Sequence, residues 1–124
     1  MEVLRVEGSG YTPKVVLDPA SNTFEISGRS LPEDVSAFYS PIIEWINNYA
    51  QSPNKKTVFE FKLTYYNTAS SKLLLNIMSK LEDIVADDNE VLIKWYYPED
   101  DEDLEEAGEE YADIVDVPFE SIPY

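Results

Sequence analysis

Short apolar or alternating segments predict four β-strands along the chain. The clearest is 57–63 (TVFEFKL), whose odd-numbered residues share one apolar face while its even-numbered residues share a more polar one. The segments 13–18 and 23–27 flank a Pro-Ala-Ser-Asn turn, so they predict a β-hairpin. The segment 91–97 (VLIKWYY) is bounded by a proline and predicts a further strand.

Apolar residues three or four positions apart predict two long helices and one short one. The first helix opens at Pro32-Glu33-Asp34, and Pro41 within it removes a backbone donor, so we expect a kink or a split there. The second runs from about Ala69 to Ala86 and is followed by a turn at residues 87–89. The three apolar stripes comprise Val35, Phe38, Ile42, Ile43, Ile46 and Tyr49; Leu74, Ile77, Met78, Leu81, Ile84 and Val85; and Leu104, Ala107, Tyr111, Ile114 and Val115.

The predicted order of elements is β-β-α-β-α-β-α, and residues 117–119 add an extended segment that can form a short final strand. Strands that alternate with helices require crossover connections, and these imply a sheet that is at least partly parallel. We therefore expect a small α/β sandwich with a mixed sheet of four to five strands. The length of 124 residues suits a single domain, 1–124, with an acidic C-terminal region, 97–124, packed on it.

Negative charge is concentrated at the C-terminal end of the chain. The sequence has 25 acidic and 9 basic residues, a formal net charge of −16, and residues 97–124 contain no lysine or arginine. Bulk electrostatics therefore argue against binding to nucleic acid or to an anionic membrane. The acidic region is interpreted either as a solvated helix face or as a docking surface for a basic partner, and a nucleic-acid mimic is a third possibility.

Composition also excludes several chemistries. The chain has no cysteine and no histidine, which removes thiol nucleophiles, disulfides, imidazole bases and cysteine–zinc sites. The acidic run 99–103 lacks the alternating ligands and central glycine of an EF-hand loop. We therefore expect a protein that is not an enzyme and has no metal or cofactor. Without a signal peptide or a long apolar run, we also expect a soluble cytoplasmic protein.

The segment that follows the central strand carries the most informative chemistry. Four short polar residues, Asn67, Thr68, Ser70 and Ser71, cluster where the second helix begins. One interpretation is structural, with Asn67 or Thr68 serving as the N-cap. The other is functional, because a phosphate at a helix N-terminus is stabilised by free N–H groups, and Lys72 would add a positive contact.

Two tryptophans and four tyrosines are the remaining candidates. Trp45 and Trp95 are predicted to be core anchors. Tyr65, Tyr66, Tyr96 and Tyr97 end two strands that should be neighbours in the sheet. Successive side chains of a strand alternate faces, so at least one of each pair should be exposed near the second helix. These tyrosines are interpreted as partner-binding residues, or alternatively as a half-buried rim.

The strand–loop–helix unit resembles the phosphoacceptor region of STAS-type anti-sigma-factor antagonists, and more closely the SiaC family of bacterial regulatory phosphoproteins. The segments that carry the resemblance are Leu63-Thr64-Tyr65-Tyr66-Asn67-Thr68-Ala69-Ser70-Ser71-Lys72, Lys94-Trp95-Tyr96-Tyr97, Ile43-Glu44-Trp45-Ile46 and Pro118-Phe119. The resemblance covers nearly the whole chain. It implies a STAS-like fold and a non-enzymatic, partner-switching role.

The resemblance further implies that Thr68 is the phosphoacceptor of a protein kinase and a PP2C-type phosphatase. Its phosphorylation state would decide whether the protein binds a signalling target, which in this family is a diguanylate cyclase that controls cyclic-di-GMP and biofilm growth. The residues expected to stabilise the phosphate are Asn67, Ala69, Ser70, Ser71 and Lys72. The alternative function is an acidic interaction module, or a nucleic-acid mimic, that acts through its C-terminal region without phosphorylation.

Overall fold

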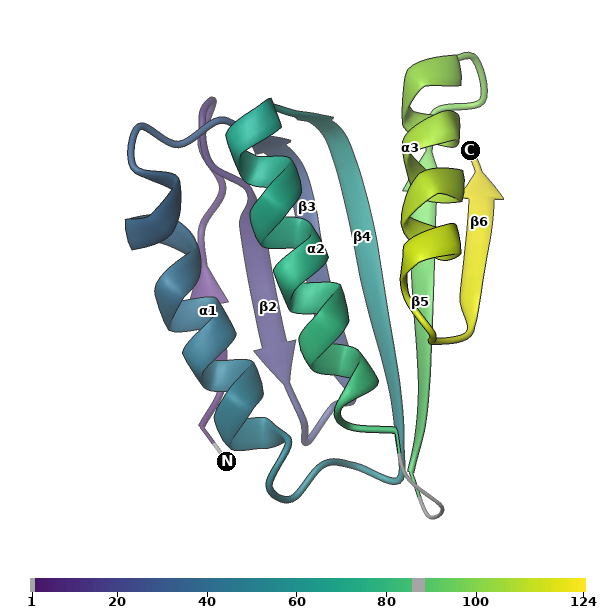
Figure 1. Cartoon of the computed structure of the whole chain (residues 1–124). Helices are drawn as coiled ribbons and strands as arrows, with labels where there is room; N and C mark the ends of the chain where they lie inside the picture. The colour runs from purple at the N-terminus through teal and green to yellow at the C-terminus, as the bar shows by residue number, and fades with distance from the viewer. Residues whose placement is uncertain (1, 86–88) are drawn as a thin grey trace.

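The computed structural model describes residues 2–85 and 89–124. The chain forms one mixed sheet and three helices, and each helix connects two strands of the sheet (Figure 1). The elements are β1 (Leu4–Val6), β2 (Lys14–Asp18), β3 (Thr23–Ser30), α1 (Val35–Tyr49), β4 (Lys56–Tyr66), α2 (Thr68–Glu82), β5 (Glu90–Tyr97), α3 (Glu102–Ile114) and β6 (Phe119–Pro123).

The order of strands in the sheet is the order in the sequence, β1-β2-β3-β4-β5-β6. The first three strands are antiparallel, and β3 to β6 are parallel to one another. Right-handed crossovers that all step in the same direction place their helices on the same face of the sheet. Figure 1 shows this arrangement, with α1, α2 and α3 side by side in front of the strands. The predicted α/β class is therefore confirmed.

The sheet has six strands where four to five were expected. The extra strand is β1, which has only three residues and pairs with β2 through Leu4 and Val6. A run this short carries almost no periodic signal. The extended segment near the C-terminus does form the final strand, β6, and β4 continues three residues beyond its predicted end at Leu63.

The helices also differ in detail from the prediction. Helix α1 is continuous through Pro41, so it is not split. Helix α2 ends at Glu82, and residues 86–88, which include most of the predicted turn, lie outside the described part of the chain. Among the described residues, no helix has the length and apolar content needed to cross a membrane.

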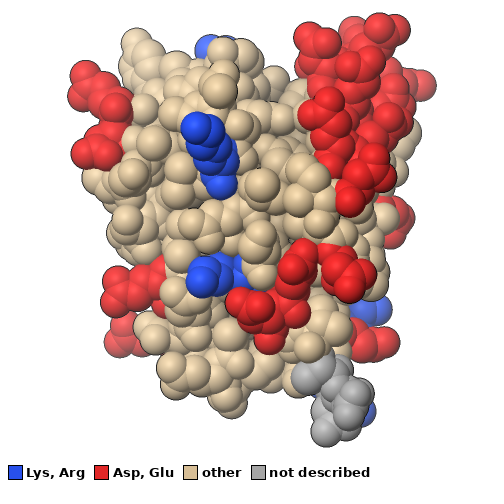
Figure 2. All heavy atoms as spheres, viewed as in Figure 1, with Lys and Arg blue, Asp and Glu red and all other residues tan. Residues whose placement is uncertain are grey.

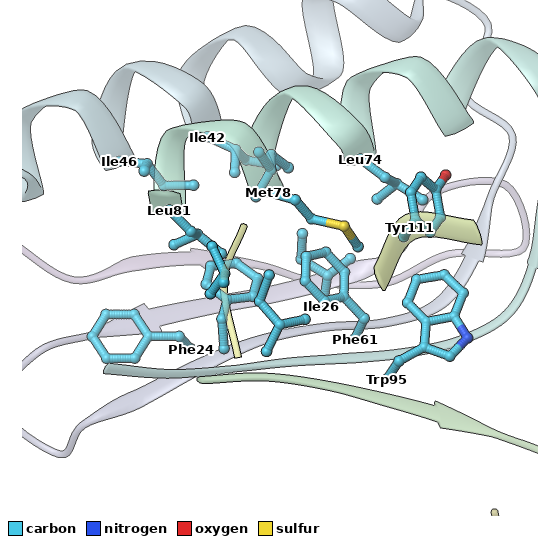
Figure 3. Packing of buried hydrophobic residues seen from close by; sticks show 14 of the residues in the cluster. Phe24, Ile26, Ile42, Ile46, Phe61, Leu74, Met78, Leu81, Trp95 and Tyr111 are labelled. Atoms are coloured by element: carbon cyan, nitrogen blue, oxygen red, sulfur yellow. The ribbon is translucent and has the colours of Figure 1, made fainter. Parts of the chain in front are cut away.

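The core lies between the sheet and the helices (Figure 3). The alternation of β4 places Phe59, Phe61 and Leu63 inside, each about 1% exposed or less. Trp95 of β5 is likewise buried, and Trp45 of α1 packs on Phe24 and stacks on Tyr49. The predicted anchoring role of both tryptophans is confirmed.

Trp95 anchors the acidic helix α3 to the sheet. Its indole Nε1 donates a hydrogen bond of 2.9 Å to the main-chain oxygen of Leu104. Its ring lies 5.3 Å from that of Tyr111, and Gly108 allows the close approach of the helix, because a Cβ there would lie 2.5 Å from Trp95 Cδ1. Leu104 and Tyr111 of the predicted apolar stripe therefore face the core, whereas Ile114 at its end is exposed, and the carboxylates of α3 face solvent (Figure 2).

A β-bulge reverses which face of the sheet the last side chains of β4 occupy. Gly28 pairs with Leu63, but the next residue of β3, Arg29, pairs with Tyr65, so Thr64 is the extra residue. The alternation is thereby reversed after Leu63. Tyr65 therefore lies on the face of the sheet that none of the described helices covers, and the Arg29 guanidinium lies 5.5 Å from the centroid of the Tyr65 ring. Tyr66 turns toward the helices.

Strands β4 and β5 separate near their carboxyl ends. Their pairing begins at Lys56 and Glu90 and stops at Phe61 and Trp95. Beyond that point β4 continues along β3, whereas β5 continues along β6. Helix α3 lies in front of β5 (Figure 1).

Candidate functional site

The start of α2 is capped by Asn67. Its side-chain Oδ1 accepts a hydrogen bond of 2.8 Å from the main-chain N–H of Ser70, and its main-chain oxygen accepts from the N–H of Ser71. Its own N–H donates to the main-chain oxygen of Ser30 at the end of β3. Of the two capping residues considered from the sequence, the structure therefore selects Asn67.

Thr68 is the first residue of α2 and is exposed. Within residues 2–85 and 89–124, its hydroxyl group makes no hydrogen bond and has no capping role. The main-chain N–H groups of Thr68 and Ala69 likewise have no acceptor in this part of the chain. A free hydroxyl thus lies beside two free donors at the positive end of a helix.

The two serines after Ala69 have different environments. Ser70 is fully buried, and its hydroxyl donates to the main-chain oxygen of Ser30, at 3.0 Å. Because its N–H is also used in the cap, Ser70 is not available to a phosphate on Thr68 in this conformation. The hydroxyl of Ser71 donates to the main-chain oxygen of Thr68 at 2.6 Å.

A groove of about 380 Å³ runs between α2 and α3 and opens beside Thr68. Leu75, Ala107 and Ile114 give it apolar walls, and the side chain of Ile114 is 62% exposed. The residues that complete the lining are Tyr66, Asn67, Thr68, Ser71, Lys72, Glu110 and Tyr111.

The charges of this groove are unequal on its two sides. Lys72, which is exposed on α2, is the only basic residue among those that line it. On the opposite wall Glu110 belongs to a helix with three acidic residues in its first turn and no basic residue in its last. A negatively charged group added at Thr68 would therefore be attracted by Lys72 and repelled by α3.

Two tyrosines line the groove beneath Thr68. The Tyr111 hydroxyl donates to the main-chain oxygen of Ser71 at 3.0 Å, and Tyr66 packs edge-on against Trp95. Burial raises the pKa of both hydroxyls above the ordinary tyrosine value. Both groups are consequently neutral at physiological pH and act as hydrogen-bonding groups rather than as charges.

The four predicted interface tyrosines do not form one cluster. Tyr65 is 49% exposed on the uncovered face of the sheet, whereas Tyr66 lines the groove. Tyr96 is half-buried on the uncovered face, where its hydroxyl donates to Glu60. Tyr97 is only 8% exposed and donates to Glu105, so it packs within the molecule. The four tyrosines are dispersed for two reasons. The bulge at Thr64 changes which face the last residues of β4 occupy, and β4 and β5 separate before their ends.

Two residues of the site were not predicted from the sequence. Ser30 accepts hydrogen bonds from both Asn67 and Ser70, although it is far from them in sequence, and no local pattern marks it. Tyr111 was identified as part of an apolar stripe, but its contact with Ser71 depends on the packing of α3 against α2. Clusters of acidic residues that could hold a metal ion are absent from the described residues.

Known proteins share this fold and this sequence pattern. An uncharacterized protein of Pseudomonas aeruginosa (strain UCBPP-PA14) is 25% identical over 119 residues, which cover 96% of this chain and 94% of the relative. The crystal structure of apo-SiaC from Pseudomonas aeruginosa has a TM-score of 0.88 at 24% identity, covering 98% of this chain and 99% of that one.

A second solved structure is the diguanylate cyclase SiaD in complex with its activator SiaC from Pseudomonas aeruginosa. The matched chain has a TM-score of 0.89 at 24% identity, with 98% and 99% of the two chains covered. Beyond these structures, residues 6–124 of the sequence match the family described as SiaC family regulatory phosphoprotein. Because the match spans nearly the whole chain, this protein belongs to the SiaC family of regulatory phosphoproteins.

Proposed function

We propose that this protein is a non-enzymatic switch in which phosphorylation of Thr68 controls binding to a signalling target. The observation that carries the proposal is the free hydroxyl of Thr68, exposed at the first position of α2 while Asn67 performs the capping. A kinase can therefore modify this hydroxyl without removing a contact that the fold needs. The kinase and a PP2C-type phosphatase are the two enzymes that the family resemblance implies.

The surroundings of Thr68 favour a phosphate locally. The free N–H of Ala69 and the positive end of α2 stabilise an anion, and Lys72, one turn further along, supplies a cation. Asn67 and Ser71 keep their structural contacts in this proposal, and Ser70 supports the turn from inside. The phosphate is thus accommodated at the surface, and the domain stays folded.

The effect on a partner arises at the groove. A phosphate adds about −1.5 to −2 charges beside a groove whose far wall carries Glu110. It also engages Lys72, the only cation of the lining. A partner that seats an uncharged surface on Thr68 and the apolar walls would have to desolvate this phosphate. Phosphorylation is therefore expected to release such a partner.

We infer that the target is a diguanylate cyclase. The support is the similarity in fold to SiaC, the activator that forms a complex with the diguanylate cyclase SiaD. The unphosphorylated form would bind and activate the enzyme, and exposed side chains near the site, such as Tyr65 and Ile114, are available for contact.

Affinity capture from native-host extract tests this function. The baits are unphosphorylated wild type, wild type phosphorylated at Thr68, and the Thr68→Ala variant, with Ser71→Ala as the matched control that removes a neighbouring hydroxyl. Unphosphorylated wild type, Thr68→Ala and Ser71→Ala should retain a diguanylate cyclase and raise its cyclic-di-GMP synthesis, and the phosphorylated bait should lose it.

Equal capture by all four baits would contradict the switch. If the amount of partner retained by all four baits also fell steeply as the salt concentration rose, the acidic surface of α3 would be the better candidate for the binding site. Binding would then be independent of phosphorylation. The acidic side chains concentrated over α3 make this the second candidate (Figure 2).

A further inference from the structure

Three buried hydroxyl groups from three different elements meet beneath the first turn of α2. They belong to Ser30 at the end of β3, Tyr39 of α1 and Ser70 of α2, and each residue is 0% exposed. The surrounding cluster of buried side chains is apolar. An uncompensated hydroxyl in such a place would be costly, so the arrangement of hydrogen bonds is informative.

The donors form one directed chain. Ser70 Oγ donates to the main-chain oxygen of Ser30 at 3.0 Å, and Ser30 Oγ donates to Ser70 Oγ at 2.9 Å. Since each hydroxyl has a single proton, the contact of 2.5 Å between Tyr39 and Ser30 must be donated by Tyr39. Burial raises the pKa of Tyr39, so it keeps this proton at physiological pH.

The chain ends on an acceptor that also holds the cap. The main-chain oxygen of Ser30 accepts from Ser70 Oγ and, at 3.0 Å, from the N–H of Asn67. Both residues that flank Thr68 and Ala69 are therefore fixed to the same carbonyl. Among the described residues, no buried side-chain polar atom lacks a hydrogen-bond partner.

We propose that Ser30, Tyr39 and Ser70 are positioning residues for the phosphoacceptor, which fix the first turn of α2 on β3 and α1 and thereby set how Thr68 is presented to its kinase. The inference rests on the proposed role of Thr68. An apolar core would hold α2 in place without these hydroxyls, but apolar contacts are non-directional. Directed hydrogen bonds specify the placement of the turn, as fully satisfied buried polar networks do.

The opposite end of α1 supplies a matched control. There the Tyr49 hydroxyl contacts Thr57 Oγ1 at 2.8 Å and accepts from the N–H of Asn54 at 2.9 Å. Tyr49 is 2% exposed and lies on the same helix as Tyr39, ten residues away. Tyr39→Phe and Tyr49→Phe thus each remove one buried tyrosine hydroxyl without removing a carbon atom, but only the first change lies beneath Thr68.

The experiment compares wild type, Tyr39→Phe, Ser70→Ala and Tyr49→Phe by three measurements. Denaturant unfolding reports global stability, and amide hydrogen exchange at Ser70 and Ser71 reports opening of the first turn. Initial rates of Thr68 phosphorylation in a fixed amount of native-host extract with ATP give kcat/KM relative to wild type, because the kinase concentration is the same for every variant. At matched stability, Tyr39→Phe and Ser70→Ala should show exchange at these two amides roughly fivefold faster and a lower kcat/KM. Tyr49→Phe should show neither change.

Two results would overturn the positioning role. One is that exchange at Ser70 and Ser71 stays at the wild-type rate in Tyr39→Phe; the other is that Tyr49→Phe lowers kcat/KM as much as Tyr39→Phe does. Absence of phosphate on Thr68 in wild type would instead overturn the proposed function, and the exchange rates would still decide whether the network positions the turn. Tyr39→Phe keeps the test decisive if Ser70→Ala does not fold.

Discussion

Tyr111 of α3 donates its hydroxyl to the main-chain oxygen of Ser71 in the first turn of α2, at 3.0 Å. The two residues are 40 positions apart in the sequence, and both line the groove. The same side chain packs on Trp95, which holds α3 through Leu104. The acidic helix and the proposed phosphorylation site are therefore parts of one packed unit.

Removing this hydroxyl should destabilise the protein modestly. Tyr111→Phe retains the aromatic packing on Trp95 but leaves the Ser71 oxygen without this donor, and the expected loss is about 1 kcal/mol of unfolding free energy. Urea denaturation gives the value. The control is Tyr124→Phe at a side chain that is 57% exposed, which should change stability little. Equal losses in the two variants would show that the contact does not stabilise the fold.

Because Asn67 and not Thr68 caps α2, the two residues should differ in how much they contribute to stability. Asn67→Ala should cost about 1 kcal/mol, the usual effect of losing an N-cap side chain. Thr68→Ala should change stability by roughly 0.5 kcal/mol or less, because its side chain makes no hydrogen bond within the described residues. Thermal denaturation of both variants checks the difference. A loss for Thr68→Ala as large as that for Asn67→Ala would contradict the assignment.

Gly108 should not tolerate a side chain, although it lies within a helix. Alanine normally favours a helix over glycine by about 1 kcal/mol, but its Cβ would lie 2.5 Å from Trp95 Cδ1. Gly108→Ala should therefore destabilise the protein by about 1–3 kcal/mol, as overpacking does, and alter the fluorescence of Trp95. In Gly10→Ala, by contrast, the new methyl group meets no atom within 4 Å, and no comparable loss is expected.

Stability should fall in alkaline solution as Tyr96 ionises. The hydrogen bond that its hydroxyl donates to Glu60 raises the pKa of Tyr96 to about 12, above its ordinary value of 10.0. The folded state therefore holds the proton more tightly than the unfolded state, so this stabilisation is complete below pH 10 and is lost as the pH rises toward 12.

Tyrosinate absorbance measured against pH tests that assignment. Tyr96→Phe should remove the high-pH component that this residue contributes, and Glu60→Gln should move it toward lower pH because the carboxylate charge is gone. The prediction fails if the titration of Glu60→Gln coincides with that of wild type.

Much of the fold could be predicted because its pattern is local. Phe59, Phe61 and Leu63 alternate with polar residues, and this alternation specifies both the strand and its buried face. The β1 strand has three residues and is held only by pairing with β2, so its sequence carries no comparable pattern. The bulge at Thr64 depends on the register with β3, which no local pattern encodes.

The candidate site was predictable only in part, because some of its features depend on contacts between residues far apart in the sequence. The polar cluster at residues 67–71 marks a helix start, but the difference between exposed Thr68 and buried Ser70 arises from contact with Ser30. The partner-binding prediction for Tyr97 assumed that neighbouring strands stay together to their ends. Because β5 leaves β4 after Trp95, that side chain packs against α3 instead.

The sequential order of the six strands has a consequence for folding. Every strand pairs with the strand before it in the chain, so each step of sheet formation closes only one short crossover or hairpin and requires no later segment to be present. The sheet can therefore grow from its N-terminal edge as the chain is synthesised, and the α3–β6 unit, which completes the groove beside Thr68, is the last to be added.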